Sequence, residues 1–119
     1  MISVYFVTNP DRKEIKLHVK GHAEAGEPGK DIVCAAASVL AYTIARNEQK
    51  QKLGDILKKV WIKEKPGELR VAVTAAGKSG YTAAMISFLT VVEGYKMLEE
   101  TYPDKVKVYI PGIKKAANS

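Results

Sequence analysis

Residues 2–20, ISVYFVTNPDRKEIKLHVK, decide the fold class of this chain because apolar side chains recur at every second position on both sides of a turn. The alternation within 2–6 and within 15–20 is the spacing of β-strands that have one buried face and one wet face. Asn9-Pro10-Asp11 favours a turn between them, so a hairpin is predicted. His18 shares the parity of Lys16 and Lys20 and is therefore expected to face solvent.

The rest of the chain adds two predicted helices and three predicted strands to this hairpin. Asp31 is expected to open the first helix, which ends near Gly54; Ser79 is a candidate N-cap for the second, which ends before Pro103. Apolar alternation predicts further strands at residues 57–64, 69–73 and 106–110. The order ββαββαβ predicts a two-layer α+β single domain over residues 1–119, with both helices on one face of a mixed sheet. It does not predict the order of the strands in space.

Composition narrows the class of protein further. The chain has 119 residues, a net charge of +6 and one cysteine. A single cysteine excludes an intrachain disulfide, and with two histidines it gives too few ligands for a cysteine-type zinc site, so no metal or cofactor is expected. The lone thiol, the short apolar stretches and the lack of a signal-peptide pattern lead us to expect a cytoplasmic protein.

The segment that carries chemistry is residues 21–38, GHAEAGEPGKDIVCAAAS. Cys34 lies three residues after the expected N-cap Asp31, where the positive end of the helix dipole and unpaired backbone N–H groups stabilise a thiolate. His22 follows the second strand and is suited to take the thiol proton and later return it to a leaving amine. The predicted pair is therefore Cys34 as nucleophile and His22 as general base and acid.

Five neighbouring positions are candidates for supporting roles. Gly21 releases the chain from strand geometry, and Gly26 and Gly29 suggest a lid that closes over substrate. Asp31 positions the helix start, and Ser38 lies one turn after Cys34 on the same helix face.

Each residue also has a plain structural interpretation. Buried cysteines are often small apolar core residues, and a histidine at a strand end is often only a surface side chain. Asp31 can be a cap and nothing more, Ser38 can bond to its own helix backbone, and the loop glycines can be simple turn residues.

Gly21-His22-Ala23, the glycine-containing segment and residues 31–38, DIVCAAAS, together resemble the signature of the ribosomal-processing cysteine proteases, the Prp family. The resemblance extends over nearly the whole chain in length and element order. It implies a small α/β protease in which His22 and Cys34 form the catalytic pair. It also implies a homodimer whose substrate is the short N-terminal extension of a large-subunit ribosomal protein, cut after an aromatic pair and before a small residue. No third catalytic residue is apparent, so a dyad is expected.

Charge is distributed unevenly along the chain. Residues 46–65 and the C-terminal region are basic, whereas Glu24, Glu27 and Asp31 lie near His22. An acidic loop suits a basic peptide such as a segment of a ribosomal protein. Equally, such charges can be solvated faces that need no partner.

Two other functions stay open beside the cysteine endopeptidase. One is a non-enzymatic ribosome- or RNA-associated basic module, and the other is a small-molecule thiol hydrolase that uses the same pair. The chain lacks the aromatic RNP pattern of an RRM and the GXXG clamp of a KH domain, so direct nucleic-acid binding is not expected. A peptide partner is expected instead, with no membrane contact.

Overall fold

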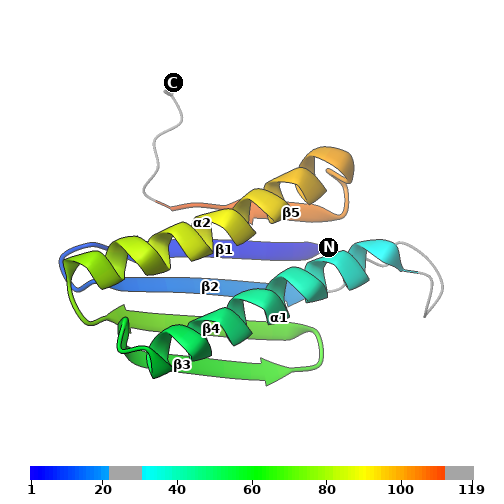
Figure 1. The fold of residues 1–119 in the computed structure, drawn as a ribbon. Helices are drawn as coiled ribbons and strands as arrows, with labels where there is room; N and C mark the ends of the chain where they lie inside the picture. Colours follow the sequence, from blue (N-terminus) through cyan, green and yellow to red (C-terminus); the bar gives the residue numbers. More distant parts are fainter. Residues whose placement is uncertain (22–30, 112–119) are drawn as a thin grey trace.

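The computed structural model describes residues 1–21 and 31–111, and within them five strands and two helices follow one another in the predicted order. The elements are β1 (Ile2–Asn9), β2 (Glu14–Gly21), α1 (Ile32–Leu53), β3 (Leu57–Lys65), β4 (Glu68–Ala75), α2 (Lys78–Thr101) and β5 (Val106–Tyr109). Both helices lie on the same face of the sheet (Figure 1). The predicted two-layer α+β fold is therefore confirmed.

The strands form one mixed sheet in the order β3-β4-β2-β1-β5. β1 and β2 make the predicted antiparallel hairpin, and β4 pairs antiparallel with both β2 and β3. β5 runs parallel to β1, with Ile2 opposite Val106. The first and last strands are thus neighbours, an arrangement that local sequence patterns do not reveal.

The core lies between the sheet and the helices. Small side chains on α1, among them Ala37, Ala41 and Ala45, are buried and let the helix backbone approach the strands. α2 contributes the large rings of Phe88 and Tyr95, both fully buried. The helices also approach each other closely at Gly94, where an added Cβ would lie 2.7 Å from the Leu40 side chain.

The two helices begin in different ways. Asp31 caps α1 as predicted, and its side chain accepts a hydrogen bond from the backbone N–H of Cys34. Gly54 follows the last residue of α1, also as predicted, and donates its N–H to the carbonyl of Lys50. The prediction for α2 is wrong, because Gly77 occupies the N-cap without a side-chain hydrogen bond and Ser79 lies inside the first turn. Within the described residues, neither helix combines the length and hydrophobicity needed to cross a membrane.

A carboxyl group lies in the core, a feature that sequence analysis missed. Glu48 of α1 is 0% exposed, and Asn47 donates its amide N–H to the carboxylate at 3.0 Å. With its amide turned toward Glu48, Gln51 donates to both carboxylate oxygens at 2.7 and 2.9 Å and accepts from the Ser87 hydroxyl of α2. Burial raises the pKa of Glu48 to about 7 because the charged form is desolvated.

Candidate active site

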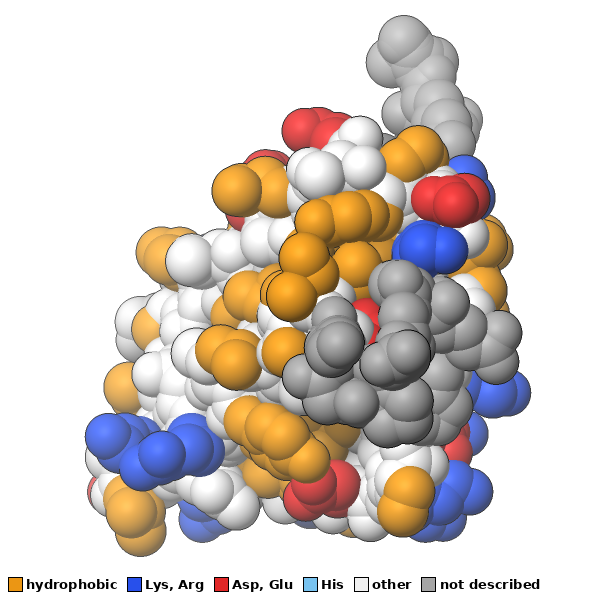
Figure 2. All heavy atoms as spheres, turned by 90° about the vertical axis from the view of Figure 1, so that its right-hand side faces the viewer, with side chains coloured by type: hydrophobic (Ala, Val, Ile, Leu, Met, Phe, Trp, Pro, Cys, Tyr) orange, Lys and Arg blue, Asp and Glu red, His pale blue; other side chains and the backbone are white. Residues whose placement is uncertain are grey.

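A pocket of about 450 Å³ lies where the first turns of α1 meet the end of β2 and the turn between β3 and β4. Half-buried Cys34 lines this pocket together with Gly21 and Ser38. Apolar side chains contribute most of its remaining wall on the sheet and helix sides: Ile2, Val19, Ala37, Ala41 and Leu69. Figure 2 views this end of the molecule and shows hydrophobic side chains grouped on it. A reactive thiol here would meet the side chains of a bound apolar segment.

The first turn of α1 fixes the backbone of Cys34. The Asp31 Oδ1 atom accepts the Cys34 N–H at 2.9 Å, and the Asp31 carbonyl accepts the Ala35 N–H at 3.1 Å. Cys34 is the third residue of the helix, so its sulfur belongs to the turn where the helix dipole favours a negative charge. The location predicted for this cysteine, at a helix start after an Asp cap, is confirmed.

Gly21 is held in a conformation that excludes a side chain. Its φ is +105°, and an added Cβ would lie 2.2 Å from the backbone oxygen of Met1. Its N–H donates to the Gly67 carbonyl at 2.8 Å, which joins the end of β2 to the β3–β4 turn. Gly21 therefore fixes the pocket wall at the point where the chain continues toward His22.

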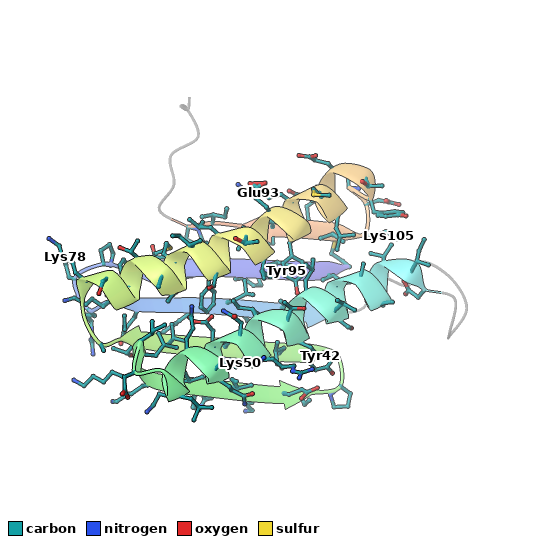
Figure 3. The ribbon with its side chains drawn as sticks, viewed as in Figure 1. Tyr42, Lys50, Lys78, Glu93, Tyr95 and Lys105 are labelled. Atoms are coloured by element: carbon teal, nitrogen blue, oxygen red, sulfur yellow. The ribbon has the colours of Figure 1, made fainter. Side chains whose placement is uncertain are left out.

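Two carboxylates lie at the β3–β4 side of the pocket. Glu64 accepts a hydrogen bond from the exposed hydroxyl of Tyr42, which raises the pKa of that phenol (Tyr42 is labelled in Figure 3). Glu68 contacts His18 at 2.5 Å and pairs with Lys65 and Arg70, each at 3.2 Å. These partners, His18 first, lower the pKa of Glu68 to about 2.

The prediction that His18 faces solvent needs correction. His18 lies on the face of the sheet away from the helices, as its alternation with Leu17 and Val19 predicts. Its side chain, however, is only 24% exposed. The carboxylate of Glu68 on the neighbouring strand β4 binds one edge of the imidazole, and the ring stacks on Tyr5 of β1. Strand neighbours that are distant in the sequence account for the difference.

The structure brings together three of the predicted site residues and leaves three untested. Cys34, Gly21 and Ser38 line the same pocket, while Asp31 caps the helix that carries the thiol. His22, Gly26 and Gly29 lie outside the described residues. Sequence analysis missed the pocket residues Tyr42, Glu64 and Leu69, because no local pattern brings β3 and β4 beside the start of α1. In the described ranges 1–21 and 31–111, no three His, Cys, Asp or Glu side chains are grouped as metal ligands.

Residues 1–107 match the sequence profile of one protein family, the cysteine protease Prp family. The chain belongs to the cysteine protease Prp family. It is accordingly a cysteine protease. No curated protein matches the chain.

Solved structures of the Prp family and its relatives share the fold. The Staphylococcus aureus essential ribosomal processing protease Prp, solved with a covalently linked product peptide, is 22% identical, with a TM-score of 0.72 over 92% of this chain and 99% of that one. The same protease with a substrate peptide is 21% identical, with a TM-score of 0.64 over 92% and 99%. SMU.848 from Streptococcus mutans is 25% identical, with a TM-score of 0.64 over 92% and 93%. These likenesses support the α+β architecture described above.

Proposed function

We propose that residues 1–119 form one cysteine endopeptidase domain that removes the short N-terminal extension of a large-subunit ribosomal protein in the cytoplasm. The observation that carries this proposal is the position of Cys34, in the first turn of α1 and on the wall of a pocket large enough for side chains of a peptide. The S. aureus relative is a ribosomal processing protease, which supports the same substrate class for this chain.

In the proposed reaction, the Cys34 sulfur attacks the carbonyl carbon of the scissile bond. His22 takes the thiol proton and gives it to the departing amine, which leaves the acyl group on sulfur as a thioester. Water then attacks the thioester, His22 takes a proton from that water, and the carboxylic product and the thiol are released. His22 is assigned this role because it directly follows Gly21, whose backbone lines the Cys34 pocket.

Asp31 has a supporting role in this scheme. Its side chain and carbonyl accept the Cys34 and Ala35 amides and so fix the first turn, whose backbone N–H groups are proposed to stabilise the oxyanion. Ser38 lines the pocket one turn further along, and Gly26 and Gly29 are proposed to let residues 22–30 close over the peptide.

The pocket chemistry is compatible with the expected cleavage site. Its apolar wall, formed in part by Val19 and Leu69, can take an aromatic side chain, and Glu64 supplies negative charge for a basic peptide. The thiol hydrolase alternative uses the same Cys34, so it is distinguished by substrate rather than by geometry.

A peptide that spans the N-terminal junction of the ribosomal protein tests the proposal. We expect wild-type protein to cleave it and Cys34→Ala or Cys34→Ser to lose activity by roughly a thousandfold or more. A panel of small thioesters is the comparison: hydrolysis of thioesters with no peptide cleavage supports the alternative. Full activity of Cys34→Ala would exclude any role for the thiol in catalysis.

Because Cys34 is the only cysteine, alkylation reports on this site alone. We expect iodoacetamide to modify wild-type protein at about pH 7, well below the range of an ordinary thiol, and the junction peptide to protect it. His22→Ala should slow alkylation at that pH. Modification only above about pH 8 would contradict thiolate activation.

A homodimer is also proposed. The outer surfaces of the helices carry hydrophobic side chains that are 46–64% exposed: Val39, Ile86, Leu89 and Met97. Burial of such side chains against a second copy would stabilise a dimer. Sedimentation of the wild type should give the mass of a dimer, and Ile86→Glu should give a monomer; a wild-type monomer at all concentrations would exclude it.

A further inference from the structure

The face of the sheet away from both helices carries side chains aligned in rows across all five strands. Figure 1 shows both helices on the other face. The central row contains Lys63 of β3, Arg70 of β4, His18 of β2, Tyr5 of β1 and Tyr109 of β5, each opposite the next. We use "open face" for this row and the two rows beside it.

The rows on either side add four lysines, three in one row and one in the other. One contains Lys65, Glu68, Lys20, Ser3 and Lys107, and the other contains Trp61, Ala72, Lys16 and Val7. Across the three rows, six basic residues accompany a single carboxylate, Glu68. That carboxylate is already bound by His18, Lys65 and Arg70. The open face therefore carries an excess positive charge comparable with the +6 of the whole chain.

Aromatic rings lie among these cations. Tyr5 stacks on Tyr109 with ring centroids 4.9 Å apart and an angle of 13° between the rings, and on His18 with centroids 5.8 Å apart. Tyr109 on the edge strand β5 is 43% exposed, and Trp61 on the edge strand β3 is 52% exposed. Tyr5 thus supports the ring of Tyr109, and the exposed rings of Tyr109 and Trp61 are accessible to a planar group.

We infer that the open face binds single-stranded RNA. Rings on a sheet surface stack unpaired bases, and surrounding Lys and Arg side chains bind the phosphates. An acidic peptide would use the charges but would have no use for the stacked rings. A duplex would keep its bases paired and away from them. The sequence alone led us not to expect nucleic-acid binding, because the rows form only when distant strands pair.

The open face lies on the side of the sheet opposite to the helix that carries Cys34, although Lys65 and Glu68 at the β3–β4 turn also line the Cys34 pocket. Lys63, Lys107 and Tyr109, the residues changed in the variants below, do not line that pocket. The direct test measures fluorescence anisotropy of a labelled single-stranded RNA of about 12 nucleotides with wild-type protein. We expect saturable binding that weakens as salt rises from about 50 to 200 mM, and weaker binding to a duplex of the same sequence. Equal affinity for the duplex, or no binding at about 50 mM salt, would overturn the proposal.

Two sets of variants distinguish base stacking and phosphate contacts on the open face from a general effect of net charge. Tyr109→Ala should weaken RNA binding by about tenfold, while Tyr109→Phe should retain it, since only the ring is needed. Lys63→Gln with Lys107→Gln should reduce the salt slope by about 1.4, at about 0.7 for each phosphate contact on a single strand.

The matched control is Lys50→Gln with Lys78→Gln, which removes the same charge from the helices (both are labelled in Figure 3). This control should bind RNA as tightly as the wild type, and thermal melting should show all variants folded. Equal losses in the two lysine pairs, or full displacement of RNA by a polyglutamate peptide at equal charge, would show that binding is only a general effect of charge and would overturn the proposal.

Discussion

The hydroxyl of Tyr95 donates a hydrogen bond of 2.8 Å to the carbonyl oxygen of Ala37, one turn after Cys34. Tyr95 is fully buried, and burial raises the pKa of its phenol; Figure 3 labels it between the two helices. The bond ties the middle of α2 to the part of α1 that carries the thiol. The position of the candidate nucleophile therefore depends on a residue 61 positions away in the chain.

Tyr95→Phe should lower the free energy of unfolding by about 1 kcal/mol, because it keeps the ring and removes the donor. Tyr42→Phe is the matched control: it also removes one hydroxyl, but from an exposed bond to Glu64, and should change stability by less than about 0.5 kcal/mol. Urea denaturation measures both. Equal changes in the two variants would show that the Ala37 bond is not specifically stabilising.

Asp31→Ala should lower stability by about 1 kcal/mol, because the Cys34 N–H loses its acceptor. Asp31→Asn keeps an acceptor oxygen and should retain most of that stability. We also expect Asp31→Ala to reduce peptide cleavage more than Asp31→Asn does, since the first turn of α1 loses its anchor. Thermal melting and cleavage rates together test this, and an unchanged Asp31→Ala protein would contradict the capping role.

Glu48 should make the protein less stable as pH rises. Its pKa is about 7 in the folded chain against an ordinary value of 4.5, so the folded state holds the proton more strongly. The stabilising contribution is complete below about pH 4.5 and is lost as pH rises through about 7. Glu48→Gln should flatten this part of the pH profile and melt several degrees higher than the wild type at about pH 8. A wild-type stability that does not fall between these pH values would exclude the effect.

Glu68 should make the protein less stable as pH falls, the opposite of the effect of Glu48. Its pKa of about 2 lies below the ordinary value of 4.5, so its stabilising contribution is present above about pH 4.5 and is lost as pH falls toward 2. Glu68→Gln should remove that acid sensitivity. Denaturation curves at a series of acidic pH values check this, and identical acid profiles for the two proteins would show that the pairing of Glu68 with His18, Lys65 and Arg70 has no effect on stability.

Gly21→Ala should be strongly destabilising, by about 2 kcal/mol or more, because the new methyl group meets the Met1 backbone and φ is positive. Gly77→Ala is the control, since an added Cβ there meets nothing within 4 Å. Soluble yield and melting temperature should separate the two variants widely. A Gly21→Ala protein as stable as Gly77→Ala would show that β1 can shift to accommodate it.

Local sequence patterns predicted most of the helices and strands, and they predicted the part of the candidate site at the start of α1. Alternation located the strands, and the Asp cap located the start of α1 and hence Cys34. Ser79 failed as a cap because Gly77 has the extended backbone that a helix start allows without any side chain, and Lys78 already belongs to the helix. A residue type that favours a cap does not by itself choose between adjacent positions.

Features made by pairing of distant segments were not predictable. Glu64 and Leu69 reach the Cys34 pocket only because β3 and β4 pack beside α1. Glu48 enters the core on a helix face whose other buried residues are all apolar. The partner of His18 likewise comes from β4, fifty residues later. Each of these depends on the strand order, which depends on the whole chain.

The position of β5 also has a consequence for synthesis of the chain. Among the five strands β1 is synthesised first, but β5, its neighbour at the edge of the sheet, is synthesised last, since residues 106–109 pair with residues 2–5. Throughout translation, β1 exposes an unpaired strand edge that could recruit another nascent chain. The hairpin with β2 protects one side early, and the other side depends on the time needed to reach Val106. Slow translation of the second half would therefore favour aggregation over folding, even for a chain whose final structure is stable.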